Sequence, residues 1–107
     1  MTSLSTHVLD TELGQPAAGV PVALYHDAEV VATAMTAENG RVPELASSLT
    51  PGVYRLVFDV AVYLTAHGRP APFLQRVSLE VTLDGAESHY HVPLLMTPYA
   101  CTTYRGS

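Results

Sequence analysis

Short segments in which apolar and polar residues alternate run along most of the chain. In one of them Val20, Val22 and Leu24 fall on a single face, as expected of a strand with one side in a core. Turn signals such as Asn39-Gly40 separate these segments, and Asp84-Gly85 predicts a hairpin. The pattern predicts strands over residues 5–10, 20–25, 29–36, 53–58, 73–83, 89–96 and 99–104.

One stretch, residues 59–68, has helical rather than alternating spacing. Asp59 can cap its first turn, and Val60, Tyr63 and Leu64 recur at helical intervals. About eight short strands with one short helix predict an all-β, antiparallel β-sandwich.

The length of the chain sets the expected number of domains. Its 107 residues suffice for one hydrophobic core, and no repeat, linker or low-complexity tract divides them. With 48% hydrophobic and 14% charged residues, a packed core is favoured over disorder. We therefore expect residues 1–107 to form a single domain.

Charge and hydropathy exclude several classes of partner. The net charge is −5, lysine is absent, and five scattered arginines form no basic stripe, so no nucleic-acid partner is expected. No apolar run approaches the roughly 18 residues that span a bilayer, so no membrane partner is expected either. A start without the pattern of a secretory signal and the single Cys101 lead us to expect a cytoplasmic protein.

Strand parity identifies the side chains that could carry chemistry. His7 lies on the first predicted strand, while His89 and His91 share a face of a later one. If these strands are neighbours, the histidines, Tyr104 and the terminal Arg105 could converge on one surface. Each residue taken singly is also compatible with a half-exposed sheet position. His89 and His91 could be two metal ligands, but no third ligand stands at a motif spacing, so no metal or other cofactor is expected.

Several blocks of the sequence resemble the 5-hydroxyisourate hydrolases, the enzyme branch of the transthyretin-like family. They are LSTHVLD at residues 4–10, GQPAAGVPV at 14–22, TAENGR at 36–41, and HYHVPLLMTPY at 89–99 followed by the terminal YRGS. The second block is common to many prealbumin-like sandwich modules. The last is specific, because the hormone-carrying transthyretins lack both that ending and the strand histidines.

The resemblance implies a transthyretin-like (prealbumin) β-sandwich and a set of site residues. His7, Arg41, His91 and Ser107 would be catalytic, and His7 and Arg41 would also bind the substrate together with Tyr104, Arg105 and Gly106. It further implies a homotetramer in which subunits join their sheets edge to edge, and two such dimers enclose a channel. The sites would lie at the dimer–dimer interface.

The implied reaction is hydrolysis of 5-hydroxyisourate, a small molecule of urate breakdown, to 2-oxo-4-hydroxy-4-carboxy-5-ureidoimidazoline. We expect His7 and His91 to position and deprotonate a water molecule and Arg41 to stabilise the oxyanion. Which histidine is the base stays open at this point. The alternatives are a non-catalytic carrier of a small aromatic ligand and a structural sandwich module, neither of which requires the strand histidines.

Overall fold

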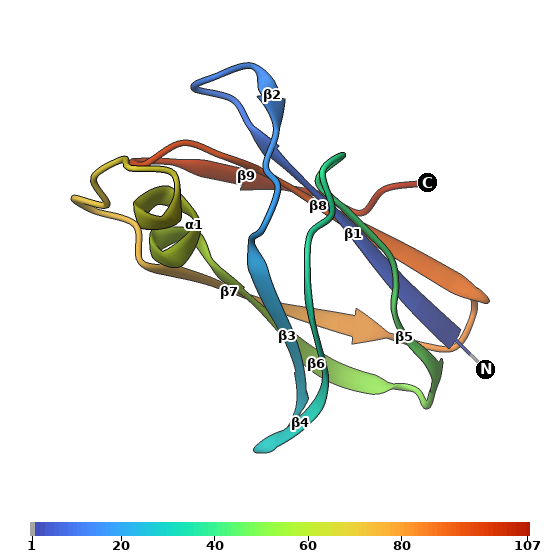
Figure 1. The fold of residues 1–107 in the computed structure, drawn as a ribbon. Helices are drawn as coiled ribbons and strands as arrows, with labels where there is room; N and C mark the ends of the chain where they lie inside the picture. Colours follow the sequence, from blue (N-terminus) through green and yellow to red (C-terminus); the bar gives the residue numbers. More distant parts are fainter. Residues whose placement is uncertain (1) are drawn as a thin grey trace.

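The computed structural model describes residues 2–107 and arranges them in two β-sheets packed face to face (Figure 1). The first sheet has the order β2-β1-β8-β9, with β5 on the remaining part of the β1 edge, and the second has the order β4-β3-β6-β7. The strands are β1 (Thr2–Asp10), β2 (Gln15–Pro16), β3 (Pro21–His26), β4 (Glu29–Met35), β5 (Arg41–Leu49), β6 (Gly52–Asp59), β7 (Arg76–Leu83), β8 (His89–Met96) and β9 (Cys101–Thr103). The predicted sandwich is confirmed.

Alternation along the strands builds the core between the sheets. Leu4 and Val8 of β1 are fully buried, as are Leu56 and Phe58 of β6 on the facing sheet. The predicted helix is confirmed as α1 (Val60–Ala66), and the carboxylate of its cap Asp59 accepts a hydrogen bond from the third residue of the helix. Within residues 2–107 no helix is long and apolar enough to cross a membrane.

One strand pair departs from the antiparallel prediction. β8 runs parallel to β1 from the pair Ser3–His89 to the pair Asp10–Met96, whereas the other strand pairs are antiparallel. The Asp84-Gly85 turn does not form a hairpin, because it carries the chain from β7 in one sheet to β8 in the other. The direction of β8 is therefore set by the crossing between sheets and not by a tight turn.

Strand β5 was not predicted, because its buried positions do not alternate. Val42, Leu45 and Leu49 point to the core at intervals of three and four residues. The register against β1 shifts twice, and Ser48 has a positive φ of 56°. These irregularities hide the period of two by which a strand is recognised in a sequence. The strand predicted from residue 73 begins only at Arg76, and the last strand is shorter than predicted.

A buried carboxylate fixes the end of β1. Asp10 is fully buried and accepts hydrogen bonds from the Tyr63 hydroxyl at 2.8 Å and from Nη1 of Arg69 at 2.5 Å. Arg69 also forms an ion pair with Glu12. Burial by itself would raise the pKa of Asp10, but the hydrogen bonds from Arg69 and Tyr63 outweigh it, so the pKa lies below its ordinary value. The network ties α1 and the turn after β1 to the strand that carries His7.

Asp10 should therefore make folding sensitive to acid. A carboxyl group with a lowered pKa in the folded state stabilises fully above its unfolded value of about 3.8, and this contribution is lost as the pH falls through the folded value. We expect Asp10→Asn to destabilise the protein by about 3 kcal/mol at neutral pH, because Arg69 loses its buried counter-charge. The free energy of unfolding of the Asp10→Asn variant should also fall less on acidification than that of the wild type. Urea unfolding at pH values of about 7 and 3 measures both effects, and superposable curves for the two proteins would contradict the assignment.

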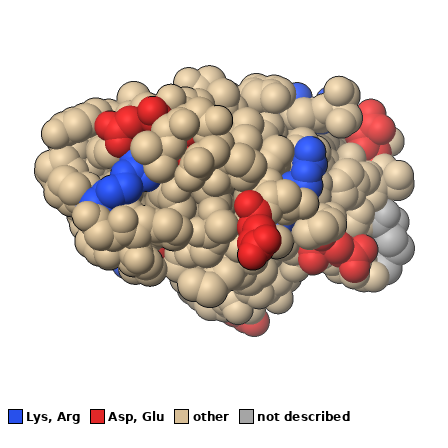
Figure 2. All heavy atoms as spheres, turned by 45° about the horizontal axis from the view of Figure 1, so that its top comes forward, with Lys and Arg blue, Asp and Glu red and all other residues tan. Residues whose placement is uncertain are grey.

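Charged side chains are sparse on the surface. On the face shown in Figure 2 they are distributed among uncharged residues, and the basic ones form no continuous stripe.

Candidate active site

The outer face of the sheet that contains β1, β5 and β8 carries three of the predicted site residues. His7 of β1 lies opposite Arg41, the first residue of β5, and Ser5 lies opposite His91 of β8. The even-numbered neighbours on β1 are buried, so these odd positions point away from the core. Neighbouring strands are about 4.8 Å apart and two residues along a strand span about 6.6 Å. The Cα atoms of His7 and His91 are therefore roughly 8 Å apart. The structure thus brings His7, Arg41 and His91 to one surface.

The turn before β5 holds His7 and Arg41 in place. Nε2 of His7 lies 2.9 Å from the carbonyl oxygen of Asn39, and the backbone N–H of Arg41 donates to Oδ1 of the same residue at 3.0 Å. A carbonyl can only accept, so Nε2 of His7 carries the proton and Nδ1 keeps a lone pair. Gly40 has a φ of +78°, and a Cβ there would lie 2.4 Å from the Val8 carbonyl oxygen, so only glycine permits this close approach.

His91 lies at the end of a chain of hydrogen bonds. Its Nδ1 is 2.7 Å from Oγ of Ser5, which is also 2.8 Å from Nε2 of His89. Nδ1 of His89 is in turn 2.6 Å from Oγ of Ser3. No hydrogen bond formed by residues 2–107 engages Nε2 of His91, so this nitrogen is the one that can meet a ligand.

The surroundings of His91 favour its neutral form. Partial burial lowers the pKa of His91, and the positive charge of Arg41, together with any proton that His7 or His89 takes up, lowers it further. The imidazole is therefore neutral near pH 7 and can accept a proton there.

The C-terminal tail lies across His91. The backbone N–H of Gly106 donates to the His91 carbonyl oxygen at 2.7 Å and forms an isolated bridge with β8. A Cβ at Gly106 would lie 2.6 Å from Cδ2 of the imidazole ring, so a side chain at this position would displace the ring or the tail. Ser107 follows directly and is exposed.

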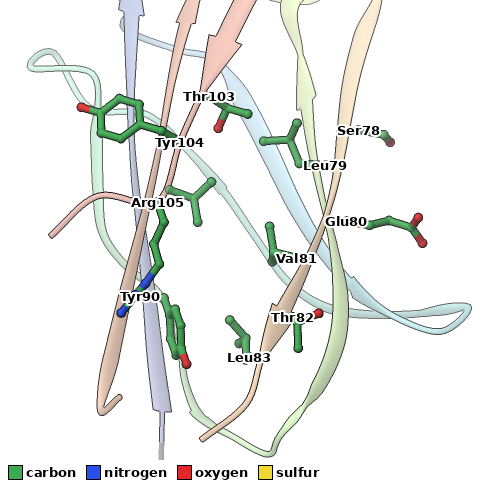
Figure 3. A pocket seen from close by; sticks show the side chains of 11 residues that line it. Ser78, Leu79, Glu80, Val81, Thr82, Leu83, Tyr90, Thr103, Tyr104 and Arg105 are labelled. Atoms are coloured by element: carbon green, nitrogen blue, oxygen red, sulfur yellow. The ribbon is translucent and has the colours of Figure 1, made fainter. Parts of the chain in front are cut away.

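Arg105, one of the predicted substrate-binding residues, points elsewhere in the single chain. Tyr104 and Arg105 border an open pocket between β7 and the strands β8 and β9, and Figure 3 shows the Arg105 side chain directed toward Tyr90 and the Tyr104 ring directed away from Leu79 and Val81 of β7. The Arg105 guanidinium carbon lies 5.1 Å from the centre of that ring, and Nη2 is 3.3 Å from a carboxylate oxygen of Glu87. The structure does not bring the Arg105 side chain to the surface shared by His7 and His91.

The sequence did not single out the serines that contact the histidines. Ser3 and Ser5 have the same strand parity as His7, which is a signal that they share its face, but only the pairing of β1 with β8 makes them partners of His89 and His91. Within residues 2–107, no three His, Cys, Asp or Glu side chains are grouped closely enough to hold a metal ion.

The sequence and the fold of the chain are similar to those of known proteins. A sequence model of the HIUase/Transthyretin family matches residues 4–106. A 5-hydroxyisourate hydrolase of Pseudomonas aeruginosa is 41% identical over an alignment covering 100% of this chain and 93% of the relative. The structure of Klebsiella pneumoniae 5-hydroxyisourate hydrolase superposes with a TM-score of 0.91 at 35% identity, covering 100% of both chains. Sea bream transthyretin in complex with thyroxine gives a TM-score of 0.86 at 28% identity, covering 96% of this chain and 93% of that one.

Proposed function

The chain belongs to the HIUase/transthyretin family, and we propose that within it the protein is an enzyme that hydrolyses 5-hydroxyisourate. The observation that carries the proposal is the shared surface of His7, Arg41 and His91, with Gly106 of the tail against it. Full-length relatives named as 5-hydroxyisourate hydrolases support the choice of substrate.

The reaction opens a cyclic amide. Water adds to a ring carbonyl carbon, the carbon–nitrogen bond breaks, and the product is 2-oxo-4-hydroxy-4-carboxy-5-ureidoimidazoline. At neutral pH the new carboxyl group ionises, so one proton leaves per turnover. The site therefore needs a group that takes the water proton and a positive group for the oxyanion.

His7, His91 and Arg41 are suited to these tasks. Nδ1 of His7 and Nε2 of His91 are free to hold and deprotonate the water from two sides. Arg41 lies beside His7, where its planar guanidinium can donate two hydrogen bonds to the developing oxyanion. Ser107 and the rest of the tail close over the ring of the substrate. The β-bridge between Gly106 and His91 supports this placement of the tail.

We also propose that residues 1–107 form a single domain and that four copies of it assemble into a homotetramer. β7 and β9 end their sheets, so both have an edge open to pairing with a second subunit. The pocket lined by Tyr104 and Arg105 lies between these two edges, where a second copy would cover it. Two such dimers would then enclose a channel, with the substrate sites at the dimer–dimer interface. The exposed free thiol of Cys101 fits a reducing cytoplasm, the compartment that we propose.

The test is the decay of freshly generated 5-hydroxyisourate, followed by its absorbance. We expect the rate to rise in proportion to the added protein and to be the same in EDTA. A decay equal to that in buffer would reject the enzyme and leave a carrier of small ligands, the role that the thyroxine complex of sea bream transthyretin suggests for this fold. Activity that EDTA removes and zinc restores would replace the histidine base with a metal centre.

A further inference from the structure

We propose that Ser5 and His89, with Ser3 at the far end, form a proton relay that fixes the tautomer of His91 and carries its proton to solvent. The inference rests on the proposed function, because that function makes His91 a proton acceptor. It adds two positioning residues, Ser5 and His89, to the groups that touch the substrate.

The parallel pairing of β1 with β8 creates the relay. Ser3 lies opposite His89 and Ser5 lies opposite His91, so two hydroxyl groups and two imidazoles alternate along the two strands. The three successive contacts are 2.6, 2.8 and 2.7 Å long, within the range of good hydrogen bonds. Ser5 is buried, whereas Ser3 is half-buried and His89 is exposed, so the chain runs from the site toward solvent.

The number of hydrogens available to the relay limits the states that it can adopt. Ser5 has one hydroxyl proton and contacts a nitrogen on each side, so it donates to one imidazole and accepts from the other while both rings are neutral. In the state ready for reaction, Nδ1–H of His91 donates to Ser5, Ser5 donates to Nε2 of His89, and Nδ1–H of His89 donates to Ser3. Ser3 in turn donates to the Ser88 carbonyl oxygen, 3.4 Å away. This state leaves Nε2 of His91 without a proton, as a base requires.

Proton transfer reverses each hydrogen bond of the relay, and the starting tautomers return after product release, when Nε2 of His91 gives its proton to water and His89 takes one up from solvent by way of Ser3. When Nε2 of His91 takes a proton from the attacking water, its Nδ1 proton passes to Ser5, and the Ser5 proton passes to Nε2 of His89. His89 holds the positive charge at the surface and releases its Nδ1 proton to solvent by way of Ser3. One proton enters from water and one leaves, which matches the proton that amide hydrolysis liberates. No electron or further reactant is involved.

The charges around His91 favour transfer away from the site. Arg41 from β5 and His7 from β1 face the imidazole, His89 faces it from the same strand, and the tail contributes the Gly106 amide. A proton kept on His91 would stand beside the Arg41 guanidinium, whereas on His89 it borders solvent.

Three variants separate a relay from a merely structural role. Ser5→Ala removes the bridge. His89→Gln keeps an amide that can bond Ser5 but cannot pass a proton through. His89→Ala leaves a space at an exposed position that added imidazole can fill. Ser47→Ala in β5 and His67→Gln at the end of α1 are matched controls, because both residues are exposed and neither belongs to the proton relay.

We expect kcat to fall at least about tenfold in Ser5→Ala and His89→Gln, with little change in KM, because a positioned acid–base group contributes on the order of 10²–10⁴-fold. The pH dependence of kcat should change in both variants, and imidazole should restore part of the activity of His89→Ala. Nitrogen-15 NMR of His91 should show the Nδ1–H tautomer in the wild type and its loss in Ser5→Ala. The controls should behave as wild type in every measurement.

Failure of the relay can be told from failure of the proposed function. If the wild type hydrolyses 5-hydroxyisourate while Ser5→Ala and His89→Gln keep its kcat and pH profile, the relay is rejected and the enzyme stands. If the wild type shows no hydrolysis, the proposed function is rejected. The tautomer of His91 then still tests the hydrogen-bonded relay, because an Nε2–H tautomer in the wild type contradicts the arrangement described above.

Discussion

Replacing His91 by Asn should lower kcat for 5-hydroxyisourate by about 10²–10⁴-fold, the usual contribution of a positioned histidine base. Asparagine can occupy the place of Nδ1 and keep the hydrogen bond to Ser5, but it has no atom at the place of Nε2. The His91→Asn variant should therefore fold normally but lose most of its hydrolytic activity. His7→Asn should cause a loss of similar size, because the amide that takes the place of Nδ1 is not basic and the hydrogen bond from Nε2 to the Asn39 carbonyl oxygen is lost.

Initial rates at saturating substrate measure this effect, with thermal unfolding as the check on the fold. His67→Asn is the matched control, since His67 is an exposed histidine at the end of α1. A wild-type rate in either site variant would remove that histidine from the mechanism.

Replacing Arg41 by Gln should lower kcat by roughly 10²-fold, equivalent to about 3 kcal/mol of transition-state stabilisation. The reason is that negative charge develops on the oxyanion only as water attacks, so the guanidinium contributes more in the transition state than in the bound substrate. Lysine at this position should recover part of the rate, because it restores the charge without the planar pair of donors.

Comparison of kcat with KM identifies the role of Arg41. Arg55→Gln is a suitable control, because Arg55 lies over the Tyr25 ring on the other sheet. A rise in KM with kcat unchanged would mean that Arg41 holds the substrate equally in both states and does not stabilise the oxyanion.

Much of the fold could be predicted because it follows from local pattern. The alternation in β3 and β6, the cap at Asp59 and the turn at Asn39-Gly40 each act over a few residues. β5 was missed because its bulges and Ser48 break the alternation. The parallel direction of β8 was missed because a crossing between sheets has no local sequence signal.

The site was predictable in part for the same reason. Parity places His7 on one face of its strand and His91 with His89 on one face of theirs, but only the sheet order shows that the two strands are neighbours. Ser5 became visible as a partner of both imidazoles only through that register. The direction of Arg105 toward Glu87 likewise depends on a contact between the tail and the turn after β7.

A crystal structure of the assembled protein with urate would locate the substrate site, because urate is a stable purine that shares the fused rings of the substrate. We expect urate on the outer face of the β1–β5–β8 sheet, contacting His7, Arg41 and His91 beside the tail. Urate bound elsewhere, such as in the pocket between β7 and β9, with these three side chains facing open solvent, would contradict this placement of the site.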